Sequence, residues 1–498
     1  SINFNATGNL SLGSLTSNGG DISLTGDDFS LFGTLNSGAG NINITHFSRG
    51  KIGLGGTTCT GSCNLTISTS ELASMTGNKL IIGGSSNGDI YVNGITQTTS
   101  TFTNGVELNV DAHVSGSNGA VIFEGSASSF STLNSNAVDG IEVNANLTTT
   151  TGALSLDGDS DNAVDTLSAN DNITFASGIT LTSASSISLS AANGGMTTAG
   201  ALTLTAPTSI TMTGAMTATG AVAMTANSGI TLNSGISTSS DALNINANSS
   251  TLSLGSGITL SSAGALTLAA GSTTSSGNLT LTSTASTISV NNALVSAGSV
   301  TITANSGLTL SNSTLTGSGN VSLQGGSALT LASGMAITSS AGNITLGAST
   351  GSITANGALT LSSNGSITIS NTLTAAGSAT LNANSGITMA ANFTANGAVA
   401  LDADLENNGS GDFTISSGSL STTNNALTVT ANDLVLTGTL NSGTGSTTIN
   451  VSDGGSLGIG FSSGFGMNLT TPELANIIGT GDLNLVNGAI TFVAGSSL

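Results

Sequence analysis

Four aspartates at alternating positions form the best candidate ligand set in the sequence. The stretch LDGDSDNAVD places Asp157, Asp159, Asp161 and Asp165 at positions 1, 3, 5 and 9 of a loop. Carboxylates with that spacing converge on a hard cation in calcium-binding loops. Ser168 occupies position 12, where such loops carry a glutamate, so an acidic, solvated turn is the alternative. Calcium is therefore the only cofactor that the sequence suggests.

A second acidic stretch, LDADLENNGSGD, has a looser spacing and a weaker claim on a cation. Its carboxylates belong to Asp402, Asp404, Glu406 and Asp412. We interpret this stretch as an acidic bulge in the chain.

The two cysteines lie close together in CTGSC, as Cys59 and Cys63. A zinc site needs about four ligands, and no second cysteine pair or histidine cluster stands nearby. A small disulfide that closes a loop in an exported protein is the preferred interpretation. Two free thiols in a loop are the alternative.

The chain lacks the groups for catalysis over much of its length. Between Ala176 and Asn392 the only charged residue is Asp241, and His, Cys, Tyr and Phe are absent. General acid–base catalysis needs ionisable side chains within reach of one another. Serine and threonine without a neighbouring base remain ordinary hydroxyls. We therefore expect no enzymatic activity.

The two histidines also stand without partners in the sequence. His113 has no ionisable neighbour that suggests a site, and His46 is followed by Arg49 and Lys51. We expect His46 to lie in a solvated turn.

The charge of the chain excludes two classes of partner. Among 498 residues only three are basic, Arg49, Lys51 and Lys79, and the net charge is −21. Nucleic-acid binding needs Lys and Arg to neutralise phosphates, and binding to anionic membrane surfaces depends on the same side chains. The sequence also contains no apolar run of the roughly 18 residues that suggest a transmembrane helix. We expect neither nucleic-acid binding nor membrane insertion.

Short words of alternating apolar and polar residues dominate the chain. In ALTLTA, from Ala201 to Ala206, alternation places the leucines on one face of a strand and the threonines on the other. Related words recur mostly every 20 to 23 residues, such as AVAMTA at 221, SVTITA at 299 and AVALDA at 398. Gly, Asn and Ser mark the joints, where turns form readily. This pattern predicts coils that each contain two or three short strands.

We therefore predict an all-β fold, a parallel β-helix (β-solenoid) of about 20–23-residue coils. Coils that stack about 4.8 Å apart would number roughly 24 over the chain. A β-sandwich needs no fixed period and has more turn-forming proline. Disordered chains combine low hydrophobicity with high charge, whereas the mean hydropathy here is +0.30 and 5% of residues are charged.

A longer repeat joins the two ends of the sequence. DFSLFGTLNSGAG at 28–40 matches DLVLTGTLNSGTG at 433–445, an offset of 405. After a three-residue shortening, NLTISTSELASMTG at 64–77 matches NLTTPELANIIG at 468–479, an offset of 402. Neither end shows the polar capping unit typical of repeat proteins. We expect a tandem array of units of about 400 residues that continues end to end into its neighbours.

Two places depart from the strand pattern. We predict short helices at 69–76 and 471–478, because each begins at a capping box. The boxes pair Ser68 with Glu71 and Thr470 with Glu473. Pro472 suits the first turn of the second helix. We expect Leu72 and Leu474 to pack on the coil beneath.

These boundaries divide the chain into four segments. We assign 1–95 to the first copy of the long-repeat module and 433–498 to the start of the second copy. Between them, 96–175 is a β-helix segment with the acidic loop, and 176–432 is a low-complexity β-helix shaft.

The repeated Thr-x-Thr words, LTLTS and ITLTS, suggest binding to an ordered surface. Evenly spaced threonines on a solenoid can match ice or sugar, although threonine also suits any solvated strand. Because the spacing drifts between coils, we expect no flat, unbroken ladder. Carbohydrate or surface binding is therefore preferred to ice binding.

The repeats resemble those of a known group of bacterial surface proteins. GALSLDGDSDNAVDTLSANDNITFASGITLTSA and ELASMTGNKLIIGGSSNGDIYVNGIT are similar to repeat regions of filamentous-haemagglutinin-like, two-partner-secreted adhesins. The resemblance is diffuse and covers essentially the whole chain. It implies a right-handed β-helical shaft, export to the bacterial cell surface or beyond, and a role in adhesion or extracellular fibres.

From these observations we expect a structural shaft of a giant extracellular filament or adhesin. Its main partner would be itself, by end-to-end continuation and by lateral bundling of a nearly uncharged surface. A cell-surface or carbohydrate target is a further expected partner. The alternative function is a carbohydrate- or surface-binding β-solenoid module.

Overall fold

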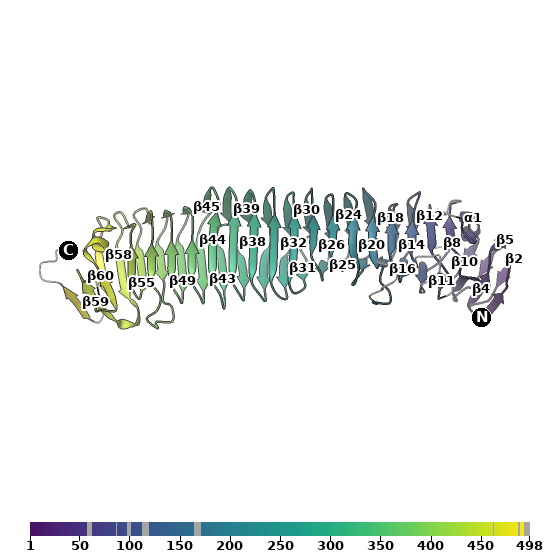
Figure 1. The fold of residues 1–498 in the computed structure, drawn as a ribbon, viewed down its shortest axis with the longest axis horizontal. Coiled ribbons are helices and arrows are strands. Elements are labelled where there is room, and N and C mark those ends of the chain that lie inside the picture. The colour runs from purple at the N-terminus through teal and green to yellow at the C-terminus, as the bar shows by residue number, and fades with distance from the viewer. Residues whose placement is uncertain are drawn as a thin grey trace. The chain divides into compact units, whose positions relative to one another are not determined.

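The alternating words form short parallel strands in the computed structural model of the chain. The structure describes residues 1–56, 62–85, 87–96, 101–111, 119–163, 171–461, 463–486 and 489–492. Contacts divide it into two units, Ser1–Leu254 and Gly255–Leu498. Each unit is a β-solenoid of stacked coils (Figure 1). Over the described residues there are about 20 turns, fewer than the predicted 24, because several coils carry long loops.

Most coils contribute one strand to each of three parallel sheets. In unit 1, sheet 1 contains β1 Ile2–Asn5, β4 Ile22–Gly26, β7 Ile42–His46, β11 Leu80–Gly84, β13 Val106–Val110, β16 Leu133–Ala137, β19 Leu154–Asp157, β22 Ile187–Ser190, β25 Ser209–Thr213, β28 Gly229–Leu232 and β31 Thr251–Leu254. Sheet 2 contains β8 Ile52–Gly55, β9 Leu65–Ile67, β12 Ile90–Asn93, β14 Val121–Phe123, β17 Ile141–Val143, β20 Asn172–Phe175, β23 Gly195–Thr198, β26 Met216–Ala218 and β29 Ile236–Thr238. Sheet 3 contains β15 Ser128–Phe130, β18 Leu147–Thr149, β21 Ile179–Thr182, β24 Leu202–Ala206, β27 Val222–Ala226 and β30 Leu243–Asn246. Two small sheets complete the unit: β2 Leu10–Leu12 with β5 Phe29–Leu31, and β3 Leu15–Thr16 with β6 Leu35–Asn36 and β10 Met75–Thr76.

Unit 2 repeats this three-sheet plan. Sheet 1 contains β34 Ser272–Ser275, β37 Ala293–Ser296, β40 Thr314–Gly317, β43 Met335–Ser339, β46 Leu359–Ser363, β49 Ala379–Ala383, β52 Val399–Asp402, β55 Leu427–Ala431, β58 Thr447–Val451 and β62 Leu483–Val486. Sheet 2 contains β32 Ile258–Ser262, β35 Leu279–Ser283, β38 Val300–Ala304, β41 Val321–Gly325, β44 Ile344–Ala348, β47 Ile367–Ile369, β50 Ile387–Met389, β53 Phe413–Ile415 and β56 Leu434–Leu436. Sheet 3 contains β33 Leu266–Ala269, β36 Ile288–Val290, β39 Gly307–Leu310, β42 Ala328–Leu331, β45 Ser352–Ala355, β48 Leu373–Ala375, β51 Phe393–Ala395, β54 Ser419–Ser421, β57 Thr439–Asn441 and β61 Ile477–Ile478. A small sheet joins β59 Ser456–Ile459 with β60 Met467–Leu469 and β63 Ala489–Phe492.

The core of each unit follows from the alternation of side chains. In β24, Leu202, Leu204 and Ala206 are buried while the two threonines between them are exposed. Most strands pair in register with the strand three places later in the chain, as β21 does with β24 and β24 with β27, so like residues stack in columns along the coils. Burial of such columns is the main stabilising contribution, at about 1.5–3 kcal/mol for each large apolar side chain.

Serines that face inward at strand ends secure the turns between coils. The Oγ atoms of Ser283, Ser339 and Ser363 donate hydrogen bonds of 2.7–2.8 Å to carbonyls of turn glycines in the preceding coil. These side chains are buried, so their hydroxyls need such partners. Small hydroxyl residues therefore let the chain turn at a corner without leaving a polar group unpaired.

Both predicted helices are present but shorter than expected. Helix α1 spans Thr69–Ala73 and α2 spans Thr471–Ala475, and both have complete capping boxes. Leu72 is buried as predicted, whereas Leu474 is only half-buried. Helix α2 lies against β56 and β61, so it packs on its coil but covers its leucine less completely than α1 does. A further coil follows α1, where the Gly77 N–H donates to the Thr101 carbonyl. β61, which follows α2, pairs only with β57 among the described strands.

The remaining helical element is the short 3-10 turn η1, Ser452–Gly454. No helix among the described residues has the length and apolar character of a membrane span.

Candidate functional site

The predicted calcium loop begins where β19 ends. The Oδ1 atom of Asp157 accepts the backbone N–H of Asp159 at 3.2 Å, and burial raises the pKa of the Asp157 carboxyl. Asp159 is fully buried; its Oδ2 accepts the Asn193 N–H at 2.8 Å, and its Oδ1 has no hydrogen-bond partner among the described residues. Asp161 is exposed and accepts the Ala163 N–H at 3.1 Å. The described carboxylates thus stabilise the turn by accepting hydrogen bonds from backbone N–H groups.

Calcium at this loop stays a prediction. The fourth predicted ligand, Asp165, lies outside the described residues. Within the described part of the chain, no group of three or more His, Cys, Asp or Glu side chains is arranged to hold a metal ion.

The acidic bulge in unit 2 adopts the same local structure. Asp402, at the end of β52, accepts the Asp404 N–H on Oδ1 at 3.2 Å, as Asp157 does in unit 1. Asp404 is fully buried, and it accepts the N–H groups of Asn408 and Gly409 and the hydroxyl of Ser452, at 2.6–3.1 Å. Burial also raises the pKa of Asp402. Here the buried carboxylate is satisfied by its own loop and by Ser452, which follows β58 two coils further along the stack.

The two acidic stretches are related to each other, which was not predicted from the sequence. Both read Asp-x-Asp-x-acid-Asn, and both place the asparagine in the left-handed region, with φ of 52° at Asn162 and 51° at Asn407. Asparagine is one of the few residues that tolerate this conformation. That shared pattern was visible in the sequence and marks a loop that leaves sheet 1.

The basic residues gather in unit 1. Lys51 Nζ lies 3.2 Å from the Tyr91 hydroxyl, 3.5 Å from Asp89 Oδ2 and 5.3 Å from the centre of the Tyr91 ring. Tyr91, Ala120 and Ile122 form a small cluster of buried side chains, and Cys63 packs against it. Lys79 forms an ion pair of 2.7 Å with Glu107.

Cys63 is disulfide-bonded. Cys59, its predicted partner, lies outside the described residues.

His46 does not lie in a solvated turn, so that prediction was wrong. The side chain is buried at the end of β7, and its Nδ1 accepts the N–H groups of Ser48 and Gly50 at 3.0 and 2.8 Å. Desolvation lowers the pKa of the imidazole. His46 closes the turn as a neutral hydrogen-bond acceptor. The prediction of a solvated turn rested on the basic residues nearby in the sequence, which carry no information about its burial.

The capping-box glutamates also join neighbouring coils. Glu71 Oε1 accepts the Leu31 N–H at 3.1 Å, while its Oε2 accepts the N–H of Ser68 at 2.9 Å. Glu473 does the same with Leu436 and Thr470, at 3.4 and 3.0 Å.

One aspartate completes each junction. Asp28 accepts the Thr66 N–H at 3.0 Å, and Asp433 accepts the Asn468 N–H at 3.0 Å. Each bond is reproduced at the sequence offsets of 405 and 402. The long repeat therefore extends to hydrogen-bonding detail.

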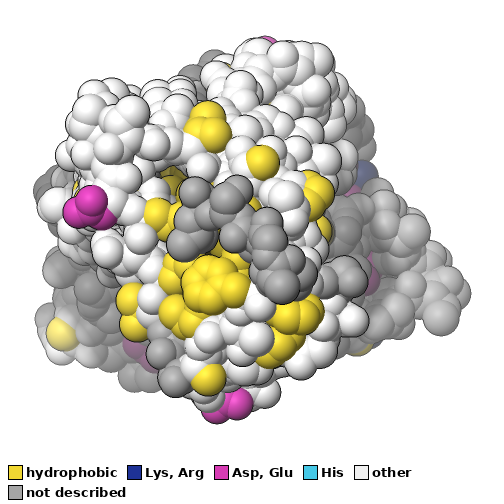
Figure 2. Space-filling view, turned by 90° about the vertical axis from the view of Figure 1, so that its left-hand side faces the viewer, with side chains coloured by type: hydrophobic (Ala, Val, Ile, Leu, Met, Phe, Trp, Pro, Cys, Tyr) yellow, Lys and Arg dark blue, Asp and Glu magenta, His cyan; other side chains and the backbone are white. Residues whose placement is uncertain are grey.

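An apolar face lies at the outer edge of the second copy. Figure 2 shows hydrophobic side chains gathered on this side of unit 2. Leu483 of β62 is 37% exposed, and Ile490 and Phe492 of β63 are 39% and 50% exposed. Among the described strands, β62 pairs only with β58, and β63 only with β59.

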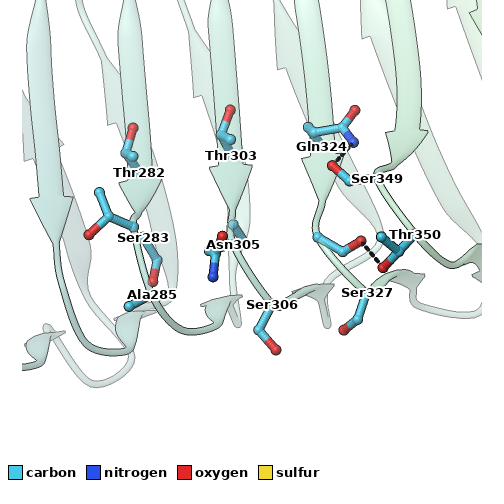
Figure 3. A pocket seen from close by; sticks show the side chains of 13 residues that line it. Thr282, Ser283, Ala285, Thr303, Asn305, Ser306, Gln324, Ser327, Ser349 and Thr350 are labelled. Atoms are coloured by element: carbon cyan, nitrogen blue, oxygen red, sulfur yellow. Dashed lines mark hydrogen bonds between the residues drawn. The ribbon is translucent and has the colours of Figure 1, made fainter.

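An open, polar groove crosses four coils of unit 2 (Figure 3). It lies at the corner between sheets 2 and 3, and Ser, Thr, Asn and Gln provide its polar side chains. None of the residues that line it is charged.

Comparison of the chain with known protein families, with curated proteins and with solved structures finds no match.

Proposed function

We propose that the chain is a structural segment of an extracellular β-solenoid filament or adhesin, built from tandem modules of about 400 residues. The observation that carries this proposal is the repeated junction, in which glutamate and aspartate bonds recur at matching positions. Each coil in a solenoid contacts only its neighbours, so a module can be repeated without redesigning its interior.

The two copies also indicate what covers the apolar face. Leu483 corresponds to Leu80 of unit 1, because Leu483 pairs with Thr447 as Leu80 pairs with Ile42. Leu80 is fully buried, since β11 pairs with β13 on its far side. By the same correspondence, Ile490 matches Ile90, which β14 covers. We infer that a coil resembling 101–123 would complete the second copy.

Several features support a structural rather than catalytic role outside the cell. From Ala176 to Asn392 the only ionisable side chain is that of Asp241, so this part offers no acid–base pair. The disulfide at Cys63 suits an oxidising compartment. The hydroxyl-rich segment from Ala176 to Asn392, whose only charged residue is Asp241, offers little repulsion to lateral bundling. A surface-binding role is the second candidate, and the polar groove of unit 2 favours it.

Electron cryomicroscopy of native material tests the filament. We expect stacked coils about 4.8 Å apart, with a longer axial repeat that matches one module. Discrete particles of one chain length would contradict a tandem filament.

A designed fusion tests the module boundary. In a fusion of residues 1–492 with a second segment, 93–498, the added β13 and β14 would cover β62 and β63 of the first segment. We expect amide exchange in β62 and β63 to be slower there than in the unfused chain. The matched control joins 1–492 to 111–498 and lacks β13. Equal exchange of β62 in the two fusions would contradict the proposed continuation.

A further inference from the structure

The groove of unit 2 arises from unequal turns at one corner of four consecutive coils. The outer two coils connect sheet 2 to sheet 3 through 284–287 and 349–351. The two coils between them turn through 305–306 and 326–327 alone. The shorter turns form the floor and the longer turns form the walls, which gives an open trough of about 630 Å³.

Close packing of the backbone keeps the floor low. A Cβ atom added at Gly326 would lie 1.7 Å from the Asn305 carbonyl oxygen, and one at Gly351 would lie 1.6 Å from that of Ser327. Only glycine permits these approaches. One wall is fixed by the Gln324 amide, which donates to Ser349 Oγ at 3.0 Å, and by Thr350, which donates to the Gly326 carbonyl at 3.2 Å.

The groove offers hydrogen-bonding groups that the protein does not use. Thr282, Thr303, Asn305, Ser306 and Ser327 line it (Figure 3), and none of their side chains is hydrogen-bonded to a described residue. Hydroxyls and amides both donate and accept. These side chains therefore match a ligand that is itself rich in hydroxyl groups.

The lining is also periodic along the stack of coils. Thr282 pairs with Thr303 in the next coil, and Thr303 pairs with Gln324 in the coil after it. Beside this column runs a longer one, unbroken over eight strands of sheet 2: Thr259, Thr280, Thr301, Ser322, Thr345, Thr368, Thr388 and Thr414. The column stays in register because the turns absorb the differences in coil length, and Ser322 interrupts its run of threonines.

We propose that this groove binds a neutral, extended, β-linked glycan laid along the stack of coils. Hydroxyl-bearing side chains repeat at the coil spacing of about 4.8 Å, close to the length of one pyranose ring in such a chain. The absence of charge in the groove disfavours acidic polymers, and its concave floor suits a chain rather than a flat ice surface. No aromatic ring is available for stacking, so a single site should bind weakly, with Kd of order 1 mM.

Titration with cellohexaose tests the proposal, with an oligogalacturonate of equal length as the acidic comparator. Thr303→Leu replaces a groove hydroxyl on β38 by a bulkier apolar side chain, and Ser327→Leu does so in a turn, and neither adds an aromatic ring on which a sugar could stack. Thr374→Leu is the matched control, because Thr374 is an exposed threonine on β48 outside the groove. We expect each groove variant to weaken cellohexaose binding tenfold or more, and the control to change it less than twofold. Circular dichroism checks that each variant folds.

Three results would overturn the glycan assignment. These are the absence of saturable cellohexaose binding, equal binding of the acidic oligosaccharide, and binding that both groove variants leave intact. Ice shaping that Thr303→Leu abolishes, without glycan binding, would reassign the groove to ice. The inference does not depend on the tandem-module proposal, since it concerns one corner of unit 2.

Discussion

The two copies of the long-repeat module share their junctions but differ in what surrounds them. In both, a glutamate closes the capping box and reaches a backbone N–H of the preceding coil, through Glu71 in one copy and Glu473 in the other. The first copy then carries Lys51 and Tyr91 on the outside of sheet 2. At the matching place in the second copy, Phe461 and Phe465 pack with ring centres 4.7 Å apart.

This difference teaches which parts of the module are self-contained. The junction depends on residues within one coil and its neighbour, so it forms in both copies. The side chains that cover the outside of sheet 2 differ between the copies, because their role is only to shield the strand beneath them from water. Gly458, the counterpart of Gly53, lies so close to the Phe465 ring that an added Cβ would be 2.3 Å from it.

The largest expected difference between the copies is the loss of stability when the helix leucine is truncated to alanine. Leu72→Ala should cost about 3 kcal/mol in local stability, because it leaves a cavity in a packed coil. Leu474→Ala should cost under about 1 kcal/mol, because Leu474 is already half-exposed to water. Amide hydrogen exchange in the strands next to α1 and α2 measures both losses. Equal losses would show that the half-burial of Leu474 does not describe the protein in solution.

Removing the junction glutamates should affect both copies alike. Glu71→Ala and Glu473→Ala should each cost about 2 kcal/mol, because a charged acceptor of backbone N–H groups is lost. Glu→Gln at the same positions keeps one acceptor oxygen and should cost about half as much. Exchange of the Leu31 and Leu436 amides is the direct measurement. If amide exchange becomes faster in only one copy, the shared hydrogen bonds are not what stabilises the junction.

Acid should weaken the first copy through His46, which has Val451 as its counterpart in the second. The folded-state pKa of His46 lies below the ordinary value of 6.5, so the unfolded chain takes up the proton first. Stability is complete above about pH 6.5 and falls as the pH drops towards the folded-state pKa. His46→Asn keeps an acceptor but does not titrate, so it should remove this loss of stability below about pH 6.5. Unfolding curves at several pH values provide the test, and an unchanged pH slope in the variant would contradict it.

The smallest effect should come from one backbone position. Arg49 has φ of 63°, and its counterpart Gly454 has φ of 58°. Because a side chain is strained in this region and glycine is not, Arg49→Gly should stabilise the first copy by about 0.5–1 kcal/mol. Gly454→Arg in the second copy is the reciprocal variant and should destabilise it by a similar amount. Thermal unfolding of both variants gives the comparison, and a loss of stability in Arg49→Gly would contradict the strain argument.

The sequence by itself determined the features that depend on near neighbours. Alternation in words such as ALTLTA decided which side chains face the core, because successive residues of a strand point to opposite faces. The capping boxes located α1 and α2, because their bonds span three residues. The long repeat predicted the shared junction, although not that Glu71 and Glu473 also bind the neighbouring coil.

Only the tertiary structure decided the features that depend on the next coil. It buried His46, left Leu474 half-exposed and kept the threonine column of sheet 2 in register through turns of unequal length. It also hollowed the groove between those turns, which no local pattern marks. The physical reason is that each strand pairs with one about 20 or more residues away, so burial, register and surface shape depend on how much chain each loop between coils absorbs.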